Sequence, residues 1–95
     1  MRINTGSFLL FPISDLYLNA MAKVLFFGEL KDISGHAELE LTAGDLNALM
    51  NCLYEKWPDL KSKTILKAIN QTVVEENSVL HAADEVALMP PFSGG

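Results

Sequence analysis

Hydrophobic and polar positions alternate in two segments of the first half of the chain. Residues 23–27 (Lys-Val-Leu-Phe-Phe) are rich in branched and aromatic side chains, and residues 38–41 read Glu-Leu-Glu-Leu. Both patterns are typical of strands. Because side chains of a strand point to alternate faces, Leu39 and Leu41 are expected to face a core and the two glutamates water. We predict that the two strands form a hairpin with a long connection, in which Ser34-Gly35 marks a turn.

The longest helical signal follows this hairpin. Apolar residues recur there at the spacing of one helical face, at Leu46, Leu49, Met50, Leu53 and Trp57. Thr42 is expected to cap the start of the helix, with Asp45 as the acid of a capping box. Pro58 is expected to end it, because the residue before a proline is pushed out of the helical region.

The second half of the chain contains three shorter strand signals, at residues 65–69, 73–74 and 86–89. Asn70-Gln71-Thr72 is a candidate tight turn, and Val79-Leu80 is expected to cap the core. A right-handed crossover through the helix would place the first and last strands side by side and parallel. The predicted fold is therefore α+β: a β-grasp (ubiquitin-like) domain, with one main helix packed across a mixed sheet and a protruding C-terminal tail.

Composition narrows the possible functions. The chain has 95 residues, 49% of them hydrophobic, and a formal net charge of -5 without a basic cluster, so one small domain that does not bind nucleic acid is expected. No stretch approaches the roughly 20 apolar residues of a membrane span. The single cysteine, Cys52, fits a reducing, cytoplasmic compartment. His36 and His81 lie far apart and outside any metal-binding motif, so no metal site is expected.

Residues 1–20 stand outside the pattern. Arg2 and the apolar run at residues 8–11 are compatible with a secretory signal, but the run is short and Pro12 breaks it. Met21 begins the patterned segment. We interpret residues 1–20 as an N-terminal extension and residues 21–95 as the domain, with residues 90–95 as an extended functional tail.

The last six residues, Pro-Pro-Phe-Ser-Gly-Gly, follow the final strand directly. Together with residues 23–27, the helix ending at Trp57, Ala-Ile-Asn-Gln-Thr at 68–72 and Asp-Glu-Val-Ala at 84–87, they resemble the small subunit of molybdopterin synthase, a ubiquitin-like sulfur carrier. The resemblance spans residues 21–95. One departure is Ala83, where many relatives have glycine; if φ is positive there, alanine is strained by about 1 kcal/mol.

The resemblance implies a chemistry for Gly95. A separate ubiquitin-activating-like enzyme would adenylate its carboxyl group with ATP and magnesium, and a sulfur donor protein would convert it to a thiocarboxylate. The large synthase subunit, in a heterotetramer of two small and two large subunits, would then use this sulfur to form the dithiolene of molybdopterin from cyclic pyranopterin monophosphate. The chain itself would be a carrier without a bound cofactor, and the catalytic groups would belong to the large subunit.

The tail residues fit a narrow channel in a partner by their size. Gly94 and Gly95 allow close backbone approach, Ser93 is small, and Phe92 is expected to anchor at the mouth of the channel, beyond Pro91. A second predicted contact lies on the sheet. If Val24, Phe26, Val86 and Leu88 face the helix, then Phe27, Val73 and Met89 form an apolar partner interface on the opposite face. The alternative is that the N-terminal extension covers that face.

Other residues and functions remain as alternatives. Cys52 is interpreted as an incidental thiol, Trp57 as a core residue, His36 and His81 as loop residues, and Asp84 and Glu85 as turn and surface residues. The rival functions are a sulfur carrier for thiamine thiazole or another pathway, a ubiquitin-like modifier conjugated to lysines, and a binding module with an inert tail. The glycine tail alone does not separate them.

Overall fold

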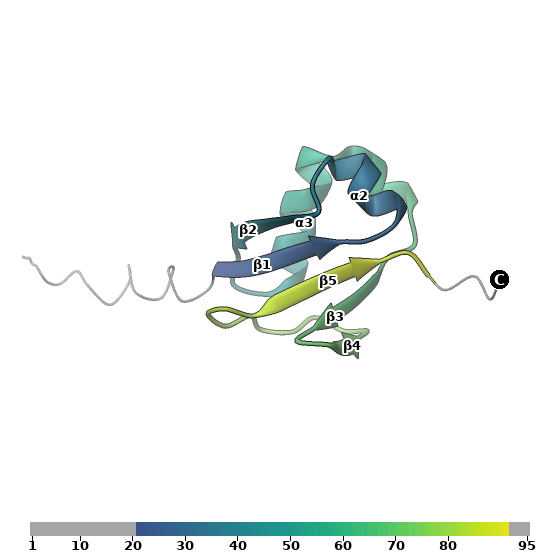
Figure 1. Ribbon diagram of the computed structural model, residues 1–95. Coiled ribbons are helices and arrows are strands. Elements are labelled where there is room, and N and C mark those ends of the chain that lie inside the picture. Colours follow the sequence, from purple (N-terminus) through teal and green to yellow (C-terminus); the bar gives the residue numbers. More distant parts are fainter. Residues whose placement is uncertain (1–20, 92–95) are drawn as a thin grey trace, which may run out of the picture.

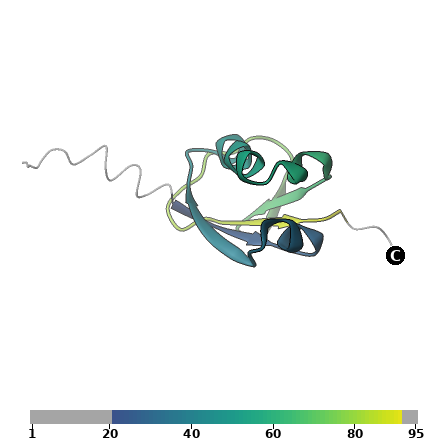
Figure 2. The ribbon, with the colours of Figure 1, turned by 90° about the horizontal axis from the view of Figure 1, so that it is seen from above.

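The computed structural model describes residues 21–91, in which a five-stranded mixed sheet is covered on one face by helices (Figures 1 and 2). The elements in chain order are β1 (Met21–Phe26), α2 (Glu29–Ser34), β2 (Glu38–Thr42), α3 (Leu46–Lys56), the 3-10 helix η1 (Pro58–Ser62), β3 (Leu66–Ile69), β4 (Thr72–Val74) and β5 (Glu85–Met89). The predicted strands and main helix are confirmed. The short helices α2 and η1 were not predicted.

β5 is the central strand of the sheet, whose order is β2-β1-β5-β3-β4. It runs parallel to β1, with Val24 opposite Val86, and antiparallel to β3, with Ala68 opposite Ala87. The predicted parallel pairing of the first and last strands is therefore confirmed. Because β5 has hydrogen-bonded neighbours on both sides, the point where it ends is held firmly.

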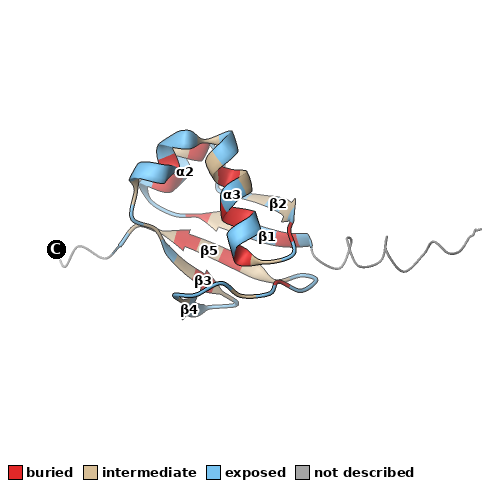
Figure 3. Ribbon diagram, turned by 180° about the vertical axis from the view of Figure 1, so that it is seen from behind, coloured by how far each residue is buried: buried red, intermediate tan, exposed pale blue. Residues whose placement is uncertain are grey.

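The core lies between the sheet and α3 (Figure 3). Val24, Val86 and Leu88 point from the sheet toward the helix and are fully buried, and so are Leu49 and Leu53 of α3. Burying a side chain of this size stabilises the fold by about 1.5–3 kcal/mol. Leu39 and Leu41 of β2 are half-buried against this core, while Glu38 and Glu40 are exposed, as predicted.

The start of α3 differs from the prediction. The capping residue is Asp45, whose Oδ1 accepts a hydrogen bond from the Ala48 N–H at 2.8 Å. Thr42 is instead the last residue of β2. Two further N–H groups of the first turn are satisfied by residues 77 and 78, because Asn47 N–H donates to Asn77 Oδ1 and Leu46 N–H donates to the Ser78 carbonyl oxygen, each at 2.8 Å. The N-terminus of α3 is thus fully occupied by the protein's own groups.

The end of α3 agrees with the prediction. The helix stops at Lys56, Trp57 follows as its C-cap, and Pro58 begins η1. Trp57 is half-buried, and its ring meets Phe26 edge-on at a centroid separation of 5.9 Å. Its predicted place at the core is confirmed.

Helix α2 occupies the connection between β1 and β2. Glycines bound it on both sides: Gly28 is the N-cap without a side-chain hydrogen bond, and Gly35 is a left-handed C-cap with φ 76°. Leu30 fixes the helix by burying its side chain completely. The predicted turn at Ser34-Gly35 is therefore the end of a short helix.

Candidate functional site

The root of the C-terminal tail lies where β1 and β5 end together. The Phe27 N–H donates to the Leu88 carbonyl oxygen at 3.0 Å, after the last paired residues of the two strands. Pro90 follows β5 and is half-buried, and Pro91 is exposed. Proline has no N–H group, so the chain leaves the sheet here. The predicted tail residues Phe92, Ser93, Gly94 and Gly95 lie outside the described residues.

The sheet face opposite α3, here called the open face, carries a group of apolar side chains beside this root. Register places Leu25, Ala87, Ala68 and Val73 in one row across four strands, and Leu66 opposite Met89 in the next row. Phe27, Val73 and Leu66 are 46%, 57% and 37% exposed, while Met89 is half-buried. Apolar side chains grouped on an exposed face are typical of a contact surface.

The three residues predicted for a partner interface, Phe27, Val73 and Met89, therefore share one face, and their role as an interface stays a prediction. Leu66 also lies on this face and was not predicted there. Leu66 could have been found by extending the alternation of Ala68 backward by two residues.

The opposite end of the open face is charged. Lys23 lies there between Glu40 of β2 and Glu85 of β5, while Glu38, at the β2 edge, borders the apolar row next to Leu25. The apolar group is thus confined to the half of the face that adjoins the tail root. A partner that covers this half would also lie beside the emerging tail.

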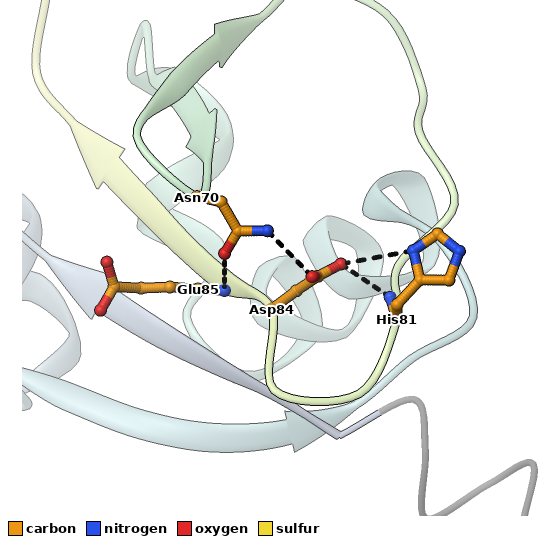
Figure 4. Close-up of polar contacts among 4 residues, drawn as sticks. All are labelled: Asn70, His81, Asp84 and Glu85. Carbon is orange, nitrogen blue, oxygen red and sulfur yellow. Dashed lines mark hydrogen bonds and ion pairs between the residues drawn. The ribbon is translucent and has the colours of Figure 1, made fainter.

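A hydrogen-bonded cluster ties the β3–β4 turn to the start of β5 (Figure 4). The Asn70 side chain donates to Asp84 Oδ1 at 2.9 Å and accepts from the Glu85 N–H at 3.0 Å. The Asn70 N–H donates to the Glu85 carbonyl oxygen at 2.8 Å. Asn70 and Gln71 have positive φ angles of 51° and 73°, a conformation that asparagine tolerates better than most residues. The predicted tight turn is confirmed.

The burial of Asp84 differs from the sequence-based interpretation. It was expected at the surface, but its side chain is only 13% exposed. Its Oδ2 accepts a hydrogen bond from the His81 N–H at 2.7 Å, with the His81 ring nitrogen Nδ1 3.7 Å away. Asp84 and Glu85 do not form a carboxylate pair for acid–base chemistry, since Asp84 is engaged by structural hydrogen bonds.

The environment of Asp84 makes stability depend on acid pH. Burial opposes its charge, but hydrogen bonds from the Asn70 side chain and the His81 backbone, and the attraction of His81, outweigh burial and lower the pKa of Asp84. A lowered folded-state pKa contributes stability above the unfolded-state value of about 4, and this stability is lost as pH falls through the folded value. We expect the stability difference between wild type and Asp84→Asn to shrink as the pH falls from about 5 toward 2, measured by urea unfolding.

The exposed carboxylate Asp59 supplies the control for this experiment. Asp59→Asn should change stability little, and by the same amount across the range. A difference between wild type and Asp84→Asn that stays constant down to pH 2 would contradict the assignment.

Ala83 has a φ of 66°, so the strain expected from the sequence is present. An L-residue in this region destabilises the fold by about 1–2 kcal/mol. Replacing it with glycine removes this strain but lowers stability by about 0.4–1 kcal/mol, because glycine gives the unfolded chain more conformational entropy. Ala83→Gly is therefore expected to stabilise the domain by about 0.5–1 kcal/mol, measured as a rise in the urea midpoint at unchanged slope. The neighbouring Ala82 has no positive φ, so Ala82→Gly is the matched control and should lower the midpoint. If Ala83→Gly and Ala82→Gly changed the urea midpoint equally, Ala83 would not be strained.

The remaining candidate residues gain no chemical role. Cys52 is half-buried on α3, and His36 lies against Trp57 with ring centroids 5.7 Å apart. Within residues 21–91, no three His, Cys, Asp or Glu side chains are grouped to hold a metal ion. None of the helices in this part of the chain is long and apolar enough to cross a membrane.

Sequence comparisons with known proteins match this chain to one protein family. The model of the ThiS family matches residues 24–95. The chain is 35% identical over 81 residues to the molybdopterin synthase sulfur carrier subunit of Escherichia coli (strain K12), covering 79% of this chain and all of the relative. It is 30% identical over 78 residues to the protein of the same name from Arabidopsis thaliana, covering 77% and 81%.

Two solved structures share the fold. The small archaeal modifier protein 1 from Methanosarcina acetivorans superposes with a TM-score of 0.69 at 27% identity, covering 81% of this chain and 98% of that one. A complex of subunits 1 and 2 of the molybdopterin-converting factor from Helicobacter pylori 26695 matches with a TM-score of 0.63 at 31% identity, covering 79% and 99%. The predicted β-grasp fold is confirmed by these likenesses.

Proposed function

The chain belongs to the ThiS family, and from this membership we propose that it is the sulfur carrier subunit of a molybdopterin synthase. The observation that carries the proposal is the placement of the tail root: central strand β5 is paired on both sides and leads directly into Pro90-Pro91, beside the apolar half of the open face. Relatives that are 30–35% identical bear this function in their names. A rigid base that presents a short tail to a partner is what such a carrier needs.

The proposed chemistry takes place at the carboxyl group of Gly95. A carboxylate is a poor electrophile, because it is anionic and its oxygens are poor leaving groups. Attack of a carboxylate oxygen on the α-phosphorus of ATP, with magnesium-bound pyrophosphate leaving, gives an acyl-adenylate. Hydrosulfide sulfur then attacks the carbonyl carbon and expels AMP, so that the product is a thiocarboxylate. In this proposal the acids and bases of both steps belong to a separate activating enzyme and a sulfur donor protein.

Sulfur transfer would occur on a second partner. We propose that the large synthase subunit receives the tail in its active site and uses the sulfur on cyclic pyranopterin monophosphate. The dithiolene contains two sulfur atoms, so two loaded carriers act for each product, as in an assembly of two small and two large subunits. The similarity to one chain of a two-subunit molybdopterin-converting factor supports such a partner.

The open face is proposed as the docking surface for this large subunit. Its apolar half adjoins the tail root, so one partner surface would cover Phe27, Val73 and Met89 while a channel beside it admits the tail. Phe27, at 46% exposure, is the largest side chain of the group and would be the main anchor. The proposed setting is the cytoplasm, which the lone cysteine favours.

A second candidate function is a protein modifier conjugated to lysines. The likeness to a small archaeal modifier protein at 27% identity favours it. The same acyl-adenylate would then pass to an amine instead of a sulfur donor. An isopeptide adduct ending in Gly95, recovered from cells under denaturing conditions, would support this candidate.

Complementation tests the proposed function and separates it from its rivals. The chain should restore molybdoenzyme activity to a bacterial strain that lacks only its own molybdopterin synthase small subunit, when co-expressed with its cognate large subunit. It should not restore thiamine-independent growth to a strain that lacks only the thiazole sulfur carrier. Restoration of thiamine synthesis alone would overturn the proposal in favour of the thiazole pathway.

A further inference from the structure

We propose that Gly28 is a positioning residue for the carrier reaction, because it forms the seat of Pro90 and thereby sets the direction in which the tail leaves the sheet. The inference rests on the proposed function for the meaning of the tail. It assigns a role to a residue outside the tail and outside the apolar group of the open face.

Gly28 lies at the junction of β1 and α2, directly against the tail root. Its backbone has φ 57° and ψ -137°, a conformation that side-chain-bearing residues rarely adopt. A Cβ atom built on Gly28 would lie 2.8 Å from Pro90 Cγ and 3.3 Å from Pro90 Cδ. The first distance is too short for two carbon atoms, which prefer about 3.5–4.0 Å. The space beside Pro90 therefore exists only because residue 28 has no side chain.

Pro90 cannot move aside as a flexible side chain would. Its Cγ and Cδ belong to a ring closed onto the backbone nitrogen, so displacing the ring moves the backbone of the tail root. The next residue is also a proline, and both have φ fixed near -65°. Pro91 also restricts Pro90 to extended conformations. A shift imposed at Gly28 is therefore passed along two stiff residues instead of being absorbed between them.

A change of direction at Pro90 alters the position that Gly95 reaches. The Phe27 N–H to Leu88 carbonyl bond precedes Pro90 in the ladder, so the chain upstream is held while the root turns. Residues 91–95 span at most about 17 Å when fully extended, as a narrow channel would require, and in that form a change of about 10° at the root would displace the far end by up to about 3 Å. A misplacement of about 1 Å can cost about 10²-fold in a reaction that depends on orientation.

Gly35 provides the internal control for backbone strain. It also has a positive φ, 76°, at the end of α2, but a Cβ built there meets no atom within 4 Å. A substitution at either glycine strains the backbone, and more so at Gly28, whose ψ of -137° lies outside the left-handed region that Gly35 occupies. Only a substitution at Gly28 also pushes on Pro90. Gly35 therefore controls for strain at a positive φ, and removal of the Pro90 ring isolates the contact itself.

The test measures kcat and KM for loading of purified carriers by the activating enzyme, with ATP, magnesium and sulfide. For Gly28→Ala we expect a fall in kcat of several-fold and for Gly28→Val about 10²-fold, with KM changed less because the rest of the carrier surface is unaltered. Gly35→Ala and Gly35→Val should lose stability but retain kcat within about twofold. If Gly28→Val does not fold, the alanine pair decides.

A double substitution and a spectrum complete the test. In the Pro90→Ala background the ring atoms are absent, so adding Gly28→Ala should cost markedly less in kcat than it does in wild type. Independently of any activity, amide NMR signals of Phe92 and Ser93 should shift in Gly28→Ala and not in Gly35→Ala. Equal behaviour of the two alanine variants, or an unchanged cost in the Pro90→Ala background, would overturn the inference. If wild type itself is not loaded, the proposed function fails, while the NMR comparison still decides the role of Gly28.

Discussion

Deletion of Gly95 is expected to abolish synthesis of the dithiolene product by the reconstituted system. The system contains the carrier, its activating enzyme, ATP, magnesium, sulfide, the large subunit and cyclic pyranopterin monophosphate. The proposed thiocarboxylate forms on this residue, and Gly94 would end one residue short of both active sites. We expect a fall of at least about 10³-fold in the rate of product formation, because a covalent participant is removed.

Two controls show that the loss is chemical. The shortened carrier should bind the large subunit with an affinity within about threefold of wild type, since the open face supplies the proposed anchors. Cys52→Ser should form product at the wild-type rate, because the half-buried thiol on α3 has no part in the scheme. Product formation that survives deletion of Gly95, or that fails in Cys52→Ser, would contradict the assignment of the chemistry to Gly95.

Substitution of lysine on the open face is expected to weaken docking strongly. Phe27→Lys replaces the largest apolar side chain of the open face with a charge that must lose its hydration under a partner. Val73→Lys does the same at the far side of the same face. Loss of a central anchor costs about 2 kcal/mol or more, so the Kd for the large subunit should rise about 30-fold or more for Phe27→Lys, measured by titration calorimetry.

Val79 supplies the matched control for Val73. It is 66% exposed, slightly more than Val73 at 57%, and forms an isolated bridge with Asp45 at the start of α3, away from the open face. Val79→Lys should leave the Kd unchanged, with both valine variants equally folded by urea unfolding. Similar losses for Val73→Lys and Val79→Lys would contradict docking through the open face. A loss for Val79→Lys alone would move the interface to the helical side.

The hydrophobic periodicities of the strands and the main helix predicted most of the fold. The alternation around Val24 and Val86 and the apolar spacing of Leu49 and Leu53 each arise from burial against one common layer, so the patterns report the core directly. A right-handed crossover then predicts that β5 lies beside β1, as it does in the structure. That placement also predicted that Phe27 and Met89 share a face, which the pairing of β1 with β5 supports.

The short helix α2 was missed for a physical reason. It has only six residues, fewer than two helical turns, and begins without a side-chain cap, so its sequence offers neither a repeated apolar spacing nor a capping signal. The sequence signal for α2 is the pair of glycines at positions 28 and 35, which lie at the two ends of the helix. For α3, Thr42 and Asp45 both suit a cap, and the pairing of Thr42 with Met21 in the sheet decides in favour of Asp45.

Contacts between distant loops could not be predicted from spacing. The bonds from Asn70 to Asp84 and Glu85 join segments 14 and 15 residues apart through an exact arrangement of two turns. The same holds for Gly28 and Pro90, which meet only because β1 and β5 end side by side. The motifs Asn-Gln-Thr and Asp-Glu-Val carry part of the family resemblance, and in the structure their side chains hold the start of β5 to the β3–β4 turn.

The central claim is that this chain carries sulfur on the carboxyl group of Gly95, and mass spectrometry of the intact carrier tests it most directly. After incubation with the activating enzyme, ATP, magnesium and sulfide, the account predicts a gain of about 16 Da, from oxygen replaced by sulfur, with fragmentation placing the gain on Gly95. An unchanged mass would contradict the account. So would a gain of about 16 Da that fragmentation places on any residue other than Gly95.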